Sequence, residues 1–153
     1  MFQKILLPLD GSKVGEAALP AVEELVSKVC PQSNVEVVLI QVLTSLTHYV
    51  VAGETSVQIL YTEEELNQIK KQVTDYLEKL GAGLKARGAT ISLKVSVGNA
   101  ADEIIKAANE LGVDLIAIST HGRSGLSRWA LGSVTERVIR SGERPVLVVR
   151  AGK

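Results

Sequence analysis

The sequence is poor in several features that mark particular classes of protein. Only one of its 153 residues is a cysteine, Cys30, so the chain has no internal disulfide and no cysteine-rich metal site. Aromatic residues make up 3% of the chain, which argues against the stacking platforms that bind single-stranded nucleic acids. The 17 basic and 17 acidic residues cancel, so the positive charge of a general nucleic-acid binder is also missing. We therefore expect no nucleic-acid partner.

Long apolar runs are missing as well. No stretch approaches the ~20 residues that cross a bilayer. The apolar run near the start is too short for a signal peptide and lacks a small-residue cleavage site. Together with the single cysteine, this predicts a soluble protein of a reducing compartment, the cytoplasm, with no membrane partner.

Several enzyme motifs are absent too. The chain has no G-x-x-x-x-G-K-[ST], no G-x-S-x-G and no H-E-x-x-H, and its two histidines, His48 and His121, have no metal-ligand spacing. Residues 81–86, GAGLKA, match G-x-G-x-x-A, but they end a predicted helix and precede a predicted strand. A dinucleotide fingerprint needs the reverse order, so we reject it.

What the sequence does contain is an ordinary globular composition, 46% hydrophobic and 22% charged, over a length that suits one domain, residues 1–153. Short apolar or alternating runs predict five strands. They lie at residues 5–9, 35–43, 90–97, 114–119 and 145–149. Helical periodicity fills the gaps between them, at about 14–29, 62–80, 99–111 and 133–140.

Local signals refine these elements. The capping box at Thr62 starts the long helix, and Gly81, Gly83 and Gly88 mark its end. Pro20 kinks the first helix or marks an early break in it. Residues 44–61 have no clear periodicity, and we expect a loop there with a short strand around residues 57–60.

Strands that alternate with helices predict one α/β domain: a five-stranded parallel sheet, doubly wound and Rossmann-like, with helices on both faces. Ligands of such folds bind outside the carboxyl ends of the strands, where the connections change direction. With the first strand central, two segments face each other across this crevice. They are Asp10-Gly11-Ser12 and residues 119–125.

The second segment and the residues after it have the composition of an anion-binding loop. Gly122, Gly125 and Gly132 allow backbone N–H groups to turn toward an anion. A helix that begins at Ser133, in the capping-box pattern Ser-Val-Thr-Glu, adds the positive end of its dipole. From His121 onward seven basic residues outnumber two acids, which suits a small polyanion. These are Arg123, Arg128, Arg137, Arg140, Arg144, Arg150 and Lys153, against Glu136 and Glu143. The alternative is a plain loop with solvated arginines and a capped helix.

Taken together, these segments resemble the universal stress proteins. Residues 4–12, KILLPLDGS, resemble the opening of that family. Residues 119–122, STHG, then nine residues, then Gly132-Ser133, are similar to its adenine-nucleotide motif, G-x-x-G, nine residues, G-[ST]. The resemblance spans nearly the whole chain and is weakest across residues 44–61. The first glycine of the motif is Ser119 here, where a side chain either crowds the ligand or adds a hydroxyl contact.

The resemblance implies an adenine-nucleotide site (ATP with Mg²⁺, or ADP or AMP). By position, Asp10 contacts the ribose hydroxyls or helps hold the Mg²⁺, and Val42 presents backbone groups to the adenine. Each has a structural alternative: Asp10 caps its turn, and Val42 packs in the core. The predicted cofactor-binding residues are Asp10, Gly11, Ser12, Val42, Ser119, His121, Gly122, Arg123, Gly125, Gly132 and Ser133.

The same resemblance places the phosphates. Gly122, Gly132 and Ser133 line the triphosphate, although helix capping alone also accounts for a serine at position 133. Arg123 and Arg128 are candidate phosphate contacts, with plain exposure as the alternative. His121 touches phosphate or packs within its loop.

Three functions are consistent with these residues. The first is a universal stress protein that binds ATP and acts as a nucleotide-dependent regulatory module. Phosphoryl transfer needs a group that orients the nucleophile, and no residue is a convincing base, so we expect slow or absent hydrolysis. The alternatives are a weak nucleotide hydrolase or phosphotransferase, and an interaction protein that binds no nucleotide.

The last predicted strand suggests an assembly. The strand from Pro145 to Val149 is short, apolar and late in the chain, and an exposed edge of this kind invites pairing with its equivalent in another subunit. The family resemblance implies the same contact. We expect a homodimer through this strand.

Overall fold

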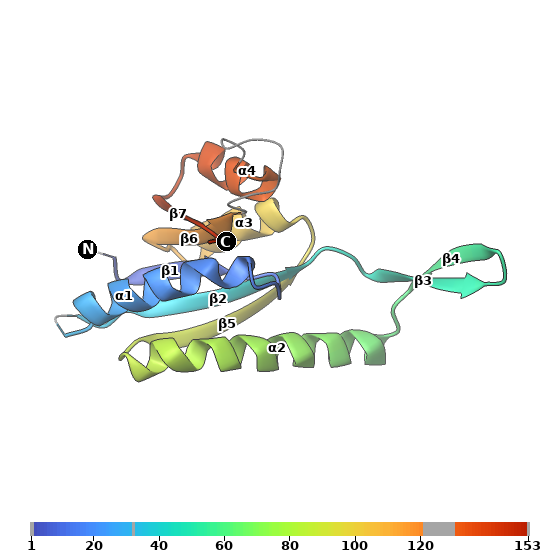
Figure 1. Cartoon of the computed structure of the whole chain (residues 1–153), viewed down its shortest axis with the longest axis horizontal. Coiled ribbons are helices and arrows are strands. Elements are labelled where there is room, and N and C mark those ends of the chain that lie inside the picture. Colours follow the sequence, from blue (N-terminus) through green and yellow to red (C-terminus); the bar gives the residue numbers. More distant parts are fainter. Residues whose placement is uncertain (1, 32, 121–130, 153) are drawn as a thin grey trace.

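The structure is a computed structural model that describes residues 2–31, 33–120 and 131–152. Its centre is a five-stranded sheet with the strand order β5-β2-β1-β6-β7, in which every neighbouring pair is parallel (Figure 1). The strands of this sheet are β1 (Lys4–Pro8), β2 (Glu36–Leu43), β5 (Thr90–Val97), β6 (Leu115–Thr120) and β7 (Val146–Arg150). The predicted α/β class, with one parallel five-stranded sheet, is confirmed.

The strand order shows where the winding changes direction. From β1 the chain passes outward to β2 and then β5, crosses to the other side of β1 as β6, and continues outward to β7. The change therefore lies between β1 and β6, the two strands that the sequence places on either side of the crevice. In a doubly wound sheet this point opens toward the carboxyl ends of the strands.

Helices cover both faces of the sheet. Successive residues of its central strands point to opposite faces, and because these residues are apolar, both faces must be covered. The helices are α1 (Leu19–Val29), α2 (Glu63–Ala86), α3 (Ala100–Glu110) and α4 (Ser133–Ser141), with a 3-10 helix, η1 (Gly15–Ala18), before α1. Ile5 and Leu7 of β1 pack in the core beneath α1 and α2, whereas Leu6 packs beneath α3 and α4. All three side chains are fully buried.

Two helix starts follow the sequence signals. Thr62 Oγ1 accepts a hydrogen bond from the backbone N–H of Glu65 at 3.2 Å, and Glu65 Oε2 accepts one from the backbone N–H of Thr62 at 2.7 Å. This is the predicted capping box of α2. At α3, Asn99 Oδ1 accepts a hydrogen bond from the backbone N–H of Asp102 at 3.1 Å. Both satisfy N–H groups that the helix itself leaves unpaired.

The predicted end of the long helix is wrong. α2 continues through Gly81 and Gly83 to Ala86, and only Gly88, at a φ of 97°, follows it. The reason at Gly81 is close packing: a Cβ there would lie 3.0 Å from Ile91 Cγ2 and 3.2 Å from Leu39 Cδ1. Gly81 therefore brings the helix close to the sheet and does not end it. α2 is the longest helix, but no helix within the described residues is both long and apolar enough to span a membrane.

The structure explains the positions of two prolines, Pro8 and Pro20. Pro20 lies in the first turn of α1, where its missing N–H costs no helical hydrogen bond, and η1 precedes it. Of the two predicted alternatives, the early break is the one observed. Pro8 is the last residue of β1, the strand end at which the sequence placed it.

A carboxylate joins the start of the chain to the start of β6. Asp114 Oδ2, just before β6, accepts hydrogen bonds from the backbone N–H groups of Gln3 at 3.0 Å and Lys4 at 2.9 Å. These two donors hold the pKa of Asp114 below its ordinary value. The start of β1 is thereby fixed beside β6, its neighbour in the sheet.

Residues 44–61 do not form the expected loop with one short strand. They contain an antiparallel hairpin of β3 (Thr47–Ala52) and β4 (Thr55–Leu60), of which the predicted strand is the second half of β4. Figure 1 shows the hairpin projecting from the body beyond the start of α2. Helical periodicity is absent from this segment because it is strand, and strand alternation is obscured because apolar residues occur on both of its faces.

Candidate functional site

A cavity of about 660 Å³ opens at the carboxyl ends of β1, β2 and β6. It lies at the change of winding direction, as the sequence predicts, and its volume is in the range of small-molecule sites. Residues from β1, β2 and β6, from the segments that follow them and from α2, α3 and α4 line it. They are Pro8, Leu9, Asp10, Gly15, Ile40, Gln41, Val42, Leu43, Thr44, Ser45, Tyr61, Ile69, Ala100, Ile104, Ile118, Ser119, Thr120, Leu131, Gly132, Ser133, Val134 and Thr135.

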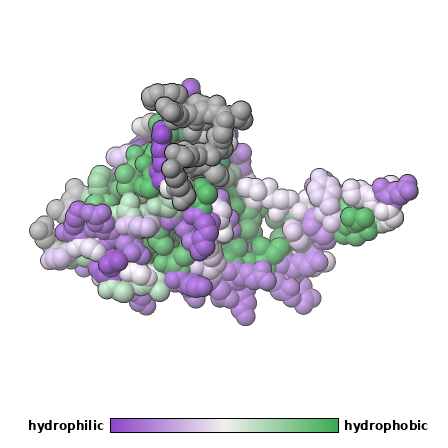
Figure 2. Space-filling model, in the orientation of Figure 1, coloured by the Kyte–Doolittle hydropathy of each residue, from purple (hydrophilic) through white to green (hydrophobic). Residues whose placement is uncertain are grey.

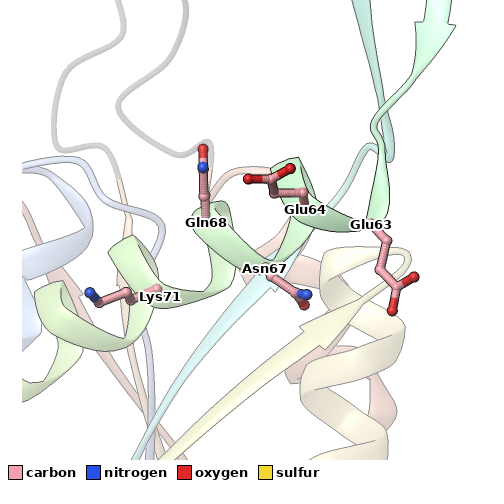
Figure 3. A pocket seen from close by; sticks show the side chains of 5 residues that line it. All are labelled: Glu63, Glu64, Asn67, Gln68 and Lys71. Atoms are coloured by element: carbon pink, nitrogen blue, oxygen red, sulfur yellow. The ribbon is translucent and has the colours of Figure 1, made fainter.

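A second depression lies on the first turns of α2, lined by Glu63, Glu64, Asn67, Gln68 and Lys71. Figure 3 shows that these side chains project from one helix in different directions and do not converge on a common point. No residue of the sheet takes part in it. It lacks the convergent polar groups of a binding site, so the cavity at the strand ends is the candidate.

The loop after β1 holds Asp10 at one wall of this cavity. Asp10 Oδ1 accepts hydrogen bonds from the backbone N–H of Ser12 at 2.9 Å and from Ser12 Oγ at 2.6 Å. Ser12 Oγ in turn accepts one from the backbone N–H of Gly15 at 3.0 Å. A Cβ on Gly15 would lie 2.3 Å from Asp10 Oδ1, so glycine is required for this arrangement. Asp10 is thus both a turn cap and an exposed lining carboxylate.

Gly11 permits the loop itself. Its φ of 86° is in the region that favours glycine, and the backbone turns there from β1 toward η1. Neither Gly11 nor Ser12 lines the cavity directly. Their part in the structure is to hold the Asp10 carboxylate in place.

The end of β6 contributes Ser119 and Thr120. Ser119 Oγ accepts a hydrogen bond from the backbone N–H of Ala18 and donates one to the carbonyl of Gly15, both at 2.8 Å. Its hydroxyl proton is therefore used to join β6 to η1. Of the two expectations for a side chain at this position, crowding or an added hydroxyl contact, the structure supports a third role, the bracing of the opposite wall.

Thr120 was not predicted as a site residue. It is buried, and its Oγ1 donates a hydrogen bond to the carbonyl of Leu131. Thr135 Oγ1 donates one to the carbonyl of Ser119 at 3.4 Å. The two threonines bring the start of α4 against the end of β6. The sequence does not reveal these roles, because it does not show that the two threonine hydroxyls are buried.

The start of α4 differs from the prediction. Ser133 is the first helical residue, and the residue at the N-cap is Gly132, with a φ of 80° and no side-chain hydrogen bond to the helix. The predicted capping box from Ser133 to Glu136 is therefore wrong. The N–H of Glu136 is bonded to the carbonyl of Gly132, the first bond of the helix. The N–H groups before it have no side-chain cap, and Gly132, Ser133 and Val134 all line the cavity.

The remaining wall is formed by the end of β2 and by the base of the hairpin. Val42 lines the cavity on the α3 side of the sheet, next to Ile40 and Ile104, and also packs against the buried cluster there. Both predicted roles of Val42 are thus compatible. Tyr61 lines the cavity beyond β4, and the rings of Tyr61 and His48 lie 4.6 Å apart. Nothing in the sequence singled out Tyr61.

The basic surplus at the end of the chain is partly neutralised. Arg137 forms an ion pair with Asp102 of α3 at 2.6 Å, and Arg140 pairs with Glu136 at 2.8 Å. Neither arginine lines the cavity. The predicted residues His121, Gly122, Arg123, Gly125 and Arg128 lie outside the described residues.

The cavity has few groups suited to acid–base chemistry. Among its described lining residues Asp10 is the one carboxylate, and none is histidine, lysine or arginine. No group of three or more histidine, cysteine or acidic side chains able to hold a metal occurs within residues 2–31, 33–120 and 131–152. The arrangement is that of a binding cavity with an apolar side, a carboxylate and an open helix N-terminus.

Comparison with known proteins gives the same picture. Residues 1–150 match the model of the universal stress protein family. The chain belongs to the universal stress protein family. It is 32% identical over 160 residues to the universal stress protein MJ0577 of Methanocaldococcus jannaschii, covering 98% of this chain and 96% of the relative. The solved structure of MJ0577 superposes with a TM-score of 0.75 and covers 100% of this chain and 99% of the other.

Two more distant structures of the family contain nucleotides. One is a universal stress protein in complex with cAMP, 21% identical with a TM-score of 0.64, covering 97% of each chain. The other is a family protein from Arabidopsis thaliana with AMP bound, 15% identical with a TM-score of 0.65, covering 98% of this chain and 92% of the other. At these identities the likeness to our protein is one of fold.

Proposed function

We propose that this universal stress protein binds an adenine nucleotide, ATP with Mg²⁺, in the cavity at the carboxyl ends of β1, β2 and β6. It then acts as a nucleotide-dependent regulatory module of the stress response. The observation that carries the proposal is the start of α4, which opens into the cavity without a side-chain cap. Two family members of the same fold hold cAMP and AMP, which supports an adenine nucleotide as the ligand class.

The polar side of the cavity suits the phosphates. The first N–H groups of α4, at Ser133, Val134 and Thr135, precede the first helical hydrogen bond, and the helix dipole is positive there. Backbone N–H groups of this kind are ready anion ligands. Gly132 and Ser133 would hold a phosphate, as the resemblance implied.

The apolar side suits the base. Ile40, Val42 and Ile104 line it, with Tyr61 and Ile69 on the neighbouring wall. Apolar and aromatic groups make up most of the lining in small-molecule sites, and a few polar groups fix the orientation. Adenine would lie here, with the backbone at the end of β2 along its edge.

Asp10 fits a ribose or a phosphate-bound Mg²⁺. Oδ1 is engaged by Ser12, whereas Oδ2 accepts none of the hydrogen bonds found between described residues. Mg²⁺ commonly takes one or two carboxylates together with phosphate oxygens and water. Mg²⁺ bound here would neutralise phosphate charge, and Asp10 would orient it.

Charge at the start of α4 gives the sharpest test. In the variant Ser133→Asp, the new carboxylate is favourable to the helix dipole but repels a phosphate. We expect thermal stability to hold or rise while the Kd for Mg-ATP, measured by calorimetry, increases at least tenfold. Ser27→Asp is the control, because it makes the same change of charge at an exposed position of α1 that does not line the cavity. Equal affinities for all three proteins would overturn the proposal.

The nucleotide in the purified protein should be identified first. Acid denaturation followed by anion-exchange chromatography separates released ATP, ADP and AMP. If the protein is isolated empty, titration with Mg-ATP to ~100 times its Kd should stabilise the fold by about 2.7 kcal/mol. No released nucleotide and no stabilisation by ATP, ADP, AMP or cAMP would favour an interaction protein that binds no nucleotide.

We propose slow hydrolysis at most. Asp10, the one carboxylate among the described lining residues, is held by Ser12 and is better suited to ribose or Mg²⁺ than to activating a water molecule. Turnover by pure protein that Asp10→Asn abolishes, while Ser12→Ala retains it, would instead favour a weak hydrolase or phosphotransferase.

We also propose a homodimer through the last strand, in the cytoplasm and without a nucleic-acid or membrane partner. β7 is an edge strand of the sheet, beside β6 alone. Val146 and Val148 pack toward α3 and α4, and Leu147 and Val149 pack toward the other face. Antiparallel pairing of β7 with its equivalent would continue the sheet into a second copy. Light scattering that shows a monomer throughout the micromolar range would contradict it.

A further inference from the structure

The hairpin of β3 and β4, residues 47–60, is an arm without cover. Figure 1 shows it extending away from the sheet, and no other helix or strand of the described residues lies beside it. The most exposed large apolar side chains of the described residues lie on it. Tyr49, Val51 and Leu60 are 70%, 77% and 68% exposed. Figure 2 shows a hydrophobic patch on this arm, separated from the body.

Register places these three residues on one face. Tyr49 lies opposite Gln58, Val51 opposite Ser56, and Leu60 opposite Thr47. Residues opposite each other in an antiparallel pair share a face, and alternate residues of one strand share it too. Tyr49, Val51 and Leu60 therefore share one face of the arm with Thr47, Ser56 and Gln58, and we call this the tyrosine face.

The other face of the arm is apolar as well. Val50 lies directly opposite Val57, and His48 lies opposite Ile59. These side chains are partly covered by one another, since Val50, Val57 and Ile59 are less exposed than those of the tyrosine face. A two-stranded hairpin with no third strand and no helix against it is marginal at best in water. The arm requires a partner.

Over the residues that the structure describes, the body of the same chain does not cover the arm. The two ends of the arm are fixed at the cavity wall, where the N–H of Tyr61 donates to the carbonyl of Leu46 at 2.9 Å. Ser45 Oγ accepts from the N–H of Thr47 at 3.2 Å, and the rings of Tyr61 and His48 lie 4.6 Å apart in a tilted arrangement. These contacts direct the arm outward from its base.

The charge of the arm points to a second copy. Residues 47–60 contain one charged side chain, Glu54 in the turn, and no lysine or arginine. An arm that met a charged partner would carry complementary charges, and an edge hairpin kept free of other strands would carry lysine or proline. Contact between two identical arms about a two-fold axis needs neither, and it brings no like charges together along the strands.

We propose that the tyrosine face of the arm packs against the tyrosine face of a second copy of this chain. A tyrosine carries roughly 200 Å² of surface, so at these exposures the three side chains bring on the order of 400 Å² per chain to the contact. That is about half of the ~800 Å² per partner of a standard interface. The contact is therefore weak and concentration-dependent. It is separate from the β7 edge and adds to whatever assembly that edge forms.

The base of the arm allows a clean deletion. Because Leu46 and Tyr61 are hydrogen-bonded to each other, residues 47–60 can be replaced by a Gly-Ser-Gly turn that keeps this bond. Sedimentation velocity between 1 and 200 μM should show a larger rise in mass for the full chain than for the deleted chain, whose rise reports assembly through β7 alone. Equal rises in the two chains overturn the proposal.

A point substitution tests the face itself. Val51→Lys places a charge on the tyrosine face, and Gln58→Lys adds the same charge to a polar position of that face, so both should reduce the rise to that of the deleted chain. Val57→Lys, on the opposite face, is the matched control and should retain the rise of the full chain. An equal loss of self-association in all three variants would show that a charge on either face of the arm prevents it. This result would overturn the assignment of the contact to the tyrosine face. Circular dichroism confirms that each variant is folded.

Disulfide trapping gives an independent readout. With Cys30→Ser as background, Val51→Cys should form an intermolecular disulfide under mild oxidation at 100 μM, at least tenfold faster than Lys71→Cys, an exposed position on α2. Equal rates would contradict the contact. The measurement is independent of nucleotide binding, so failure of the arm contact leaves the proposed function untouched, and the reverse also holds.

Discussion

The central sheet and the arm are made from the same kinds of residue, yet their surroundings are opposite. Val37 of β2 is fully buried, whereas Val51 of β3 is 77% exposed. β2 has a parallel neighbour on each side and helices over each face, while β3 has one neighbour and no cover within the described chain. An apolar, β-branched segment therefore predicts a strand but not a core position. The two regions also meet, because Tyr61 at the base of the arm lines the cavity.

A matched pair of leucines gives the largest expected contrast. Leu7 in β1 is fully buried and Leu60 in β4 is 68% exposed. Leu7→Ala removes buried methyl groups and leaves a cavity, which should lower the free energy of unfolding by about 2–5 kcal/mol. Leu60→Ala should change it by less than about 0.5 kcal/mol in dilute solution. Urea denaturation of both variants at 1 μM makes the comparison.

A large loss of stability in Leu60→Ala at 1 μM would contradict this contrast. It would mean that the arm is covered even when the chain is dilute. Repeating Leu60→Ala at 200 μM then separates the two sources of stability, because a contact between copies depends on concentration and a contact within the chain does not.

This contrast also explains how far the sequence alone could lead. The body was predictable because each buried strand is a short apolar run, each helix has its own period, and two helices have side-chain caps, at Thr62 and Asn99. The arm was not, because apolar residues on both faces erase the alternation that identifies a half-buried strand. Two predictions from local sequence signals were wrong, the end of α2 and the cap of α4. Gly81 continues α2 because it packs against Leu39, and Gly132 caps α4 in place of Ser133.

The residues of the candidate site also fall into those that could be predicted from the sequence and those that could not. The family resemblance singled out Asp10, Val42, Gly132 and Ser133, and all four line the cavity. Thr120, Thr135 and Tyr61 were missed because their roles depend on which segments meet in space. Ser119 was noticed as a departure from the family motif, but its function follows from its contacts with Gly15 and Ala18, about a hundred positions away.

The pH dependence of stability gives a second contrast between body and arm. The body contains a carboxylate, Asp114, that accepts hydrogen bonds from two backbone N–H groups, and the arm contains no such group among its described residues. The folded-state pKa of this carboxyl is lowered mainly by the N–H of Gln3 and also by that of Lys4. Its stabilising contribution is therefore complete above the unfolded-state pKa, ~3.9, and is lost as the pH falls through the lower folded-state value. Asp114→Asn should cost about 1–2 kcal/mol at pH 7, since hydrogen bonds to charged groups are the stronger ones.

The difference between wild type and Asp114→Asn should shrink as the pH falls from 5 to 2. Urea denaturation at a series of pH values measures it. Glu36, whose pKa is lowered by the Ser92 hydroxyl and then by Lys4, should follow the same direction in Glu36→Gln. A difference that stays constant down to pH 2 would mean that the carboxylate charge of Asp114 contributes nothing. The mass of the protein in sedimentation, which reports contact between arms, should be the same in Asp114→Asn and Glu36→Gln as in wild type.

The smallest expected effect lies at the boundary between the two regions, where Thr62 follows the arm and caps α2. Thr62→Ala removes the hydroxyl that accepts from the N–H of Glu65, and an N-cap of this kind is worth about 1 kcal/mol. Because the carbonyl of Leu46 still holds the N–H of Tyr61, the arm should keep its direction. The variant should therefore unfold at lower urea, with the concentration dependence of its mass unaltered. Thr62→Ser, which keeps the hydroxyl, is the control. If Thr62→Ala abolished self-association while Thr62→Ser did not, the cap and the arm would be one cooperative unit, and body and arm would not be separable at this residue.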